Sequence, residues 1–74
     1  MAEASQLRAG TRVSWNTSQG RTRGVVVRKA VKSLKIKSFM VEASRDDPKF
    51  VVKSDASGEL AAHKAGSLRV LRRH

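Results

Sequence analysis

Two stretches of the sequence decide the fold: TRVSW at residues 11–15 and RGVVVRKAV at residues 23–31. Polar and apolar residues alternate in the first, which places Val13 and Trp15 on one face of a β-strand. In the second, three consecutive valines cannot all lie on one face of a strand. We therefore expect this strand to be bent or covered on both sides, and Gly24 is a natural position for the bulge that bends it.

The third apolar segment contains a change of phase. Leu34 and Ile36 share one parity of a strand, whereas the apolar residues at 39, 41 and 43 share the other. A single uninterrupted strand cannot place both sets on the same face, because side chains alternate with a period of two. A bulge or a turn is therefore expected near Ser38.

Two more strands are expected, at residues 49–53 and 60–63. Residues 55–58, with the sequence DASG, predict a hairpin loop between them in which Gly58 adopts the left-handed conformation. A last short segment, residues 68–71, completes the core. Short strands with turns every dozen residues or so are typical of an all-β sandwich or barrel, and no window has the apolar spacing of an amphipathic helix.

A chain of 74 residues is expected to form one domain. Closing the sheet removes exposed strand edges most completely, so we predict a small five-stranded barrel with short antiparallel strands. The expected organisation is a flexible N-terminal arm at residues 1–9, a single barrel domain at 10–71 and a basic tail at 72–74. We expect the protein to be a monomer.

Composition argues against several classes of protein. The sequence has no cysteine, so it has no disulfide framework and no thiolate zinc site, and it fits the reducing cytoplasm. Its two histidines, His63 and His74, are too few for a metal centre, and we interpret His63 as a partly buried hydrogen-bonding residue. The N-terminus does not resemble a signal peptide, and no apolar run is long enough to span a membrane. We expect no metal, no cofactor and no membrane association.

Catalysis is not expected either. Asp46 and Asp47 are adjacent in sequence, so on an extended chain their carboxylates point apart, and before Pro48 they are typical of a turn. Nothing resembles a positioned nucleophile. A domain of this size is also not expected to enclose a pocket of a few hundred Å³. We therefore predict a protein that is not an enzyme.

Three motifs in order resemble one known family. Residues 13–20, VSWNTSQG, are followed by GVV at 24–26, then by ASRDDPKFVVKSD at 43–55, and then by AHK at 62–64 with Leu68. Together they resemble the hypervirulence-associated Tudor-like domain family. The resemblance implies a small SH3-like, Tudor-like barrel and provides no catalytic residues. The family usually has Gly near Ser38, and it often has Tyr where Phe50 stands, which would add a hydroxyl that could bind a ligand.

The aromatic residues are predicted to belong to the core. Tudor-like barrels often bind methylated lysine or arginine in a cage of two to four exposed rings, but this chain has only Trp15, Phe39 and Phe50, each on an apolar parity of its strand. A cage is therefore not favoured. A groove beside Trp15 and Phe50 that accepts a peptide stays open as an alternative, which would make the chain a protein-interaction module.

The basic residues provide the main functional signal. Sixteen Lys and Arg face six Asp and Glu, which gives a net charge of +10, and no acidic residue lies between Glu3 and Glu42. Such a charge favours polyanions, of which nucleic acid is the commonest. If the second and third strands pair, they bring together the candidate nucleic-acid-binding residues, which are Arg21, Arg23, Arg28, Lys29, Lys35 and Lys37.

We predict contacts to the nucleic-acid backbone without sequence specificity, because no recognition helix and few exposed aromatic residues are expected. Two other interpretations of the same charges stay open. The basic side chains could be a solvated rim that protects strand edges from aggregation. The chain could also be a small structural or stress-related protein with no specific ligand.

Overall fold

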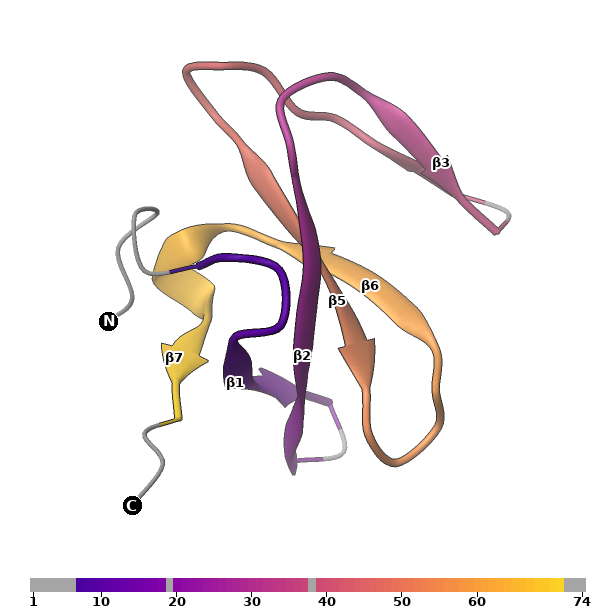
Figure 1. Cartoon of the computed structure of the whole chain (residues 1–74). Coiled ribbons are helices and arrows are strands. Elements are labelled where there is room, and N and C mark those ends of the chain that lie inside the picture. The colour runs from indigo at the N-terminus through magenta and orange to yellow at the C-terminus, as the bar shows by residue number, and fades with distance from the viewer. Residues whose placement is uncertain (1–6, 19, 38, 72–74) are drawn as a thin grey trace.

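In the computed structural model, residues 7–18, 20–37 and 39–71 are described, and they form seven strands and one turn of 3-10 helix (Figure 1). The elements are β1 (Arg12–Thr17), β2 (Gly20–Ala30), β3 (Leu34–Ile36), β4 (Phe39–Val41), β5 (Lys49–Ser54), β6 (Leu60–His63), η2 (Ala65–Ser67) and β7 (Arg69–Val70). In this part of the chain no helix is long and apolar enough to cross a membrane.

Five of the strands form one antiparallel sheet in the order β6-β5-β2-β1-β7. The long strand β2 pairs with β1 through its first half and with β5 through its second half, so the sheet curls around it (Figure 1). The two end strands, β6 and β7, do not pair with each other, and the sheet is therefore an open barrel. The predicted all-β fold of short antiparallel strands is confirmed, without full closure.

The bend in β2 is not where the sequence placed it. The register with β5 shifts between Val26 and Arg28, so the bulge lies at Val27, which is 40% exposed. Gly24 instead lies in regular pairing, opposite Ser54. A Cβ atom there would lie 2.1 Å from the carbonyl oxygen of Lys53 and 2.7 Å from the Trp15 ring, so the glycine is needed for close packing rather than for a bulge.

Two hydrophobic clusters lie on opposite sides of β5. The first contains the buried side chains of Leu7, Val13, Trp15, Val26, Phe50, Val52 and Leu68, and the second contains those of Ala30, Ile36, Val41 and Val51. Successive residues of a strand point to opposite faces, which is why Val51 faces one cluster while its neighbours face the other. The first cluster also includes Leu7, so the core begins inside the segment that the sequence assigned to an N-terminal arm.

The hairpin of β3 and β4 explains the change of phase in the third segment. Leu34 pairs with Val41 across the hairpin, and Lys37 has a left-handed φ of 53° where the chain reverses. The predicted turn is therefore confirmed, although Ser38 itself lies outside the described residues, as does the side chain of Phe39. The hairpin loop predicted at residues 55–58 is also confirmed, and Gly58 has a left-handed φ of 73°.

Candidate functional site

The six basic residues predicted to bind nucleic acid are all exposed but do not form one patch. Arg21 and Arg23 lie in the first half of β2, Arg28 and Lys29 lie near its other end, and Lys35 and Lys37 belong to the β3–β4 hairpin. The condition for bringing them together, a pairing of the second and third strands, is not met, because β2 pairs with β1 and β5 while β3 pairs with β4. The six residues therefore fall into separate groups.

Arg69, which lies near the other end of the chain, joins the group of Arg21 and Arg23 in the folded sheet. Arg23 of β2 lies opposite Ser14 of β1, and Ser14 lies opposite Arg69 of β7, while Arg21 lies opposite Asn16. Residues directly opposite each other in antiparallel strands project from the same face of the sheet. Arg21, Arg23 and Arg69 therefore share the outer face of β2, β1 and β7, and we call these three residues the arginine face.

Sequence reasoning missed Arg69. The alternation of Leu68, Arg69 and Val70 indicates that Arg69 points away from the core, but it does not indicate which strand lies beside it. That neighbour is β1, which comes from the start of the chain, and only the folded sheet shows this pairing. The same long-range pairing brings together arginines from both ends of the sequence.

The acidic side chain of Asp55 also borders the arginine face, but it is paired with Arg12, which is not one of the three residues of that face. Arg12 donates two hydrogen bonds to Asp55, one from Nη1 to Oδ1 at 3.0 Å and one from Nη2 to Oδ2. This pairing lowers the pKa of Asp55 and raises that of Arg12, and the nearby charge of Arg23 lowers the pKa of Asp55 further. The carboxylate of Asp55 is therefore already paired with Arg12.

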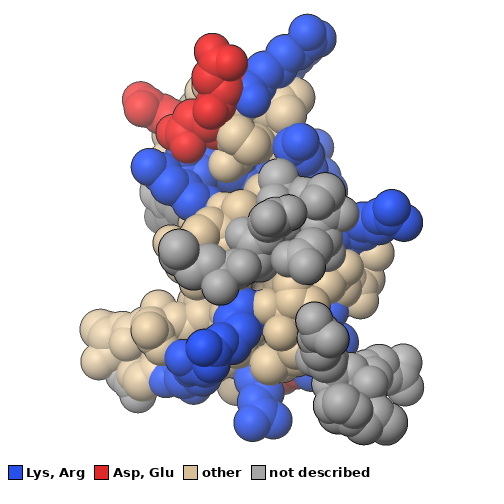
Figure 2. All heavy atoms as spheres, turned by 90° about the vertical axis from the view of Figure 1, so that its left-hand side faces the viewer, with Lys and Arg blue, Asp and Glu red and all other residues tan. Residues whose placement is uncertain are grey.

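The three residues of the arginine face themselves have no ion pair among the described residues. Most acidic side chains visible in Figure 2 gather at the top of the view, at the end of the molecule where the β4–β5 connection lies in Figure 1. The arginine face thus keeps its positive charge and can attract an anion.

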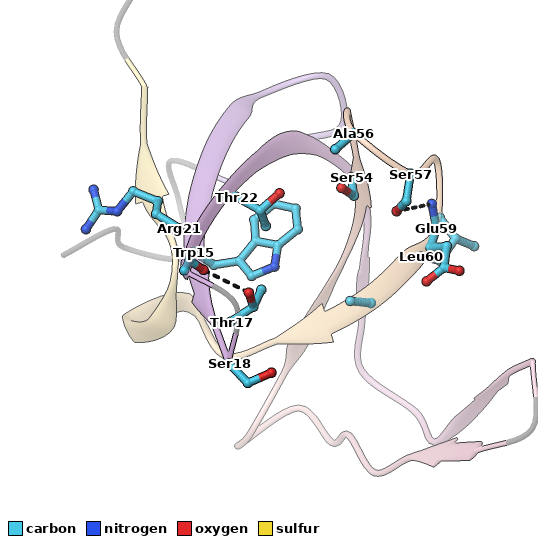
Figure 3. Close-up of a pocket in the computed structure, with 12 residues that line it drawn as sticks. Trp15, Thr17, Ser18, Arg21, Thr22, Ser54, Ala56, Ser57, Glu59 and Leu60 are labelled. Carbon is cyan, nitrogen blue, oxygen red and sulfur yellow. Dashed lines mark hydrogen bonds between the residues drawn. The ribbon is translucent and has the colours of Figure 1, made fainter.

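The structure also contains an open hollow of about 470 Å³ beside Trp15. Figure 3 shows the indole surrounded by small polar side chains from β1, β2 and the β5–β6 hairpin, which include Thr17, Thr22, Ser54 and Ser57. The hollow is open to solvent, so it is not the enclosed pocket that a domain of this size was expected to lack. Arg21 borders the hollow but points away from it (Figure 3).

Phe50 does not reach this hollow. Its side chain is fully buried in the first cluster. Of the two residues predicted to line a groove, only Trp15 lines the hollow. Trp15 itself is only 5% exposed, because its ring also packs against the core and lies 5.5 Å from the ring of His63. The hollow contains one mostly buried ring, which is too few for an aromatic cage, and the burial of Trp15 and Phe50 agrees with the assignment of these two residues to the core.

Comparison with known proteins identifies the family. The family of hypervirulence associated proteins with a TUDOR domain matches residues 10–68, and the chain belongs to this family. Among curated proteins and among solved structures, the chain has no match. The family suggests a small binding module and is generally non-catalytic, and Tudor-like domains often bind proteins or nucleic acids.

Proposed function

We propose that this protein is a small non-enzymatic module that contacts the backbone of nucleic acids without sequence specificity. The observation that carries the proposal is the arginine face, where three exposed arginines without described ion pairs project from one side of the sheet. Guanidinium groups bind phosphate through paired, charge-assisted hydrogen bonds. Phosphate contacts position a protein on nucleic acid but carry no information about base sequence.

The other predicted basic residues have a smaller part in this proposal. Arg28 and Lys29 lie beyond the bulge of β2, and Lys35 lies on a different sheet, so none of them adjoins the arginine face. Lys37 has its Nζ atom 3.4 Å from Oε1 of Glu59, which offsets part of its charge. These four residues add to the field that draws a polyanion toward the molecule.

The proposal is tested by measuring the affinity for short labelled duplex DNA, single-stranded DNA and RNA by fluorescence anisotropy. Each phosphate contact releases counterions, so we expect affinity to fall about tenfold or more between roughly 50 and 200 mM salt. The variant Arg21→Glu/Arg23→Glu is compared with Lys32→Glu/Lys64→Glu, which has the same net charge but changes exposed lysines elsewhere. We expect the first variant to bind about tenfold more weakly than the second.

Three results would contradict the proposal. If the wild-type protein does not bind any of the nucleic acids at about 50 mM salt, nucleic acid is not its partner. If the two charge-reversal variants lose affinity equally, binding follows net charge alone, and the arginine face has no special part in it. Weak and equal binding to every polyanion, including heparin, would favour a protein with no specific ligand.

A second candidate function rests on the hollow of about 470 Å³ beside Trp15. An open hollow lined by hydroxyl side chains and one indole could accept a peptide, which would make the chain a protein-interaction module. Thr22→Trp fills this hollow without changing charge. A protein partner that is captured after nuclease treatment, released by Thr22→Trp and retained by Arg21→Glu/Arg23→Glu would favour this function over nucleic-acid binding.

A further inference from the structure

We propose that the arginine face contains one defined phosphate subsite, in which Arg21 and Arg69 both bind a single phosphate of the nucleic-acid backbone. The inference rests on the proposed function and specifies where the backbone is held. A shallow pocket of about 170 Å³ lies at this place, between β1, β7 and η2, and its polar lining comes from Ser14, Asn16, Arg21, Ser67 and Arg69.

The strand order places the two arginines on opposite sides of the pocket. Strand β1 lies between β2, which carries Arg21, and β7, which carries Arg69. Adjacent strands are about 4.8 Å apart, and Arg21 lies opposite Asn16 while Arg69 lies opposite Ser14, two residues along β1, so the two arginines start roughly 12 Å from each other across β1. Arginine side chains are long enough to span half of that distance, and both guanidinium groups can therefore meet one phosphate that lies over β1.

The buried hydroxyl of Ser14 provides an independent observation. Ser14 is only 1% exposed, and its Oγ atom has no hydrogen-bond partner among the residues that the structure describes. A buried hydroxyl without a partner is unfavourable, so a serine on the outer face of β1 points to a ligand that accepts its hydrogen bond. Ser14 lines the same pocket as Arg21 and Arg69, so a phosphate held between these two arginines lies beside the hydroxyl.

The size and charge of the pocket also fit a single phosphate. Sites for drug-sized ligands usually occupy about 300–1,000 Å³, so a pocket of about 170 Å³ suits one small anion better than a whole nucleotide. None of the residues that line it in the described chain is acidic. Asn16 and Ser67 add neutral side-chain donors beside the two guanidinium groups, which is the donor set that a phosphate requires.

A double-mutant cycle tests whether Arg21 and Arg69 share one phosphate. The variants Arg21→Gln, Arg69→Gln and the double variant are titrated with a short single-stranded DNA at low salt. Each single substitution is expected to weaken binding about tenfold, because a charge-assisted contact is lost. If both residues hold the same phosphate, the loss of affinity in the double variant is expected to be at least about threefold smaller than the product of the two single losses. Substitutions of residues that share one binding partner do not have additive effects on the free energy of binding.

Two further measurements separate binding from folding. Ser14→Ala is expected to weaken DNA binding about threefold, while its stability to urea stays the same or rises, because the substitution removes an unpaired hydroxyl. Arg45→Gln removes an exposed arginine from the β4–β5 connection and is the matched control, for which we expect a change of less than about twofold. Circular dichroism confirms that each variant is folded.

The outcomes distinguish the subsite from the proposed function. If the single losses multiply in the double variant, or if Ser14→Ala binds like the wild type, no shared phosphate exists and the subsite is wrong, although nucleic-acid binding stands. A loss for Arg45→Gln equal to that for Arg69→Gln also overturns the subsite, because net charge then explains the data. If the wild-type protein does not bind the DNA at all, both proposals fail.

Discussion

The fold opposes the protonation of His63. Its ring is half-buried against the indole of Trp15, and its Nε2 atom is buried without a hydrogen-bond partner among the described residues. Burial penalises the charged imidazolium, and the pKa of His63 is therefore lower in the folded protein than in the unfolded chain.

This lowered pKa predicts a pH-dependent stability. In the unfolded chain His63 titrates near pH 6.5, so at and just below that pH the unfolded state binds more protons than the folded state. The free energy of unfolding therefore falls as the pH is lowered through about 6.5 toward the folded pKa, and it is insensitive to His63 above that window. Urea unfolding followed by the fluorescence of Trp15 measures the effect.

Variants of the two histidines provide the check. His63→Gln is expected to flatten the dependence between about pH 7 and 5, whereas His74→Gln is expected to keep it. An unchanged slope in His63→Gln would show that other groups cause the acid destabilisation. Sequence alone predicted a partly buried, hydrogen-bonding His63. The ring is half-buried, but its Nε2 atom has no hydrogen-bond partner among the described residues, and its contact with Trp15 depends on how β6 and β1 approach each other in the folded sheet.

At the scale of elements, the β3–β4 hairpin acts as a cover for one side of the sheet. Its residues Ile36 and Val41 are buried together with Ala30 of β2 and Val51 of β5, although the hairpin belongs to a separate two-stranded sheet. Side chains rather than backbone pairing therefore hold the hairpin to the rest of the molecule. This explains why apolar residues of β2 and β5 occur on both faces of these strands.

We expect Ile36→Ala to lower the free energy of unfolding by about 2–4 kcal/mol, because it leaves a cavity in the second cluster. Ile36 is only 4% exposed, whereas Met40 of the same hairpin is 63% exposed. Met40→Ala is therefore the matched control and is expected to change stability by less than about 0.5 kcal/mol. Equal effects of the two substitutions in urea unfolding would show that the hairpin is not packed against the sheet.

The strands themselves were predictable because their signals are local. Alternation predicted the strands near residues 11–15 and 49–53, and turn residues predicted the loop that contains Gly58. The pairing of strands was not predictable in the same way, because it depends on contacts between distant parts of the chain. The grouping of the basic residues, which depended on a pairing of the second and third strands, failed for this reason, and Arg69 was missed for the same one. The candidate site therefore emerged only from the folded sheet.

At the scale of the whole molecule, charge repulsion opposes folding. The protein has a net charge of +10 on 74 residues. The ion pairs among the described residues, which join Arg12 to Asp55, Lys37 to Glu59 and Lys49 to Asp47, lie at the surface and compensate only part of this repulsion. Compact folding brings the remaining like charges closer together, which destabilises the folded state.

Added salt is therefore expected to stabilise the fold while it weakens nucleic-acid binding. Screening of the repulsion between roughly 0.05 and 0.5 M sodium chloride is expected to add about 1 kcal/mol, which raises the melting temperature by roughly 4–8 °C in a domain of this size. Lys32→Glu/Lys64→Glu lowers the net charge from +10 to +6, because each substitution removes one positive charge and adds one negative charge, and its melting temperature should respond less to salt.

Because salt is expected to raise the stability of the fold and to lower the affinity for nucleic acid, the binding experiment can separate a loss of binding from unfolding. If the fold becomes more stable as salt rises, a loss of affinity over the same range cannot result from unfolding, and it must come from the released counterions of the phosphate contacts. A melting temperature that falls with salt would show that the surface ion pairs outweigh the repulsion between like charges. In that case the salt dependence of binding would have to be corrected for the unfolded fraction before it is interpreted as phosphate contact.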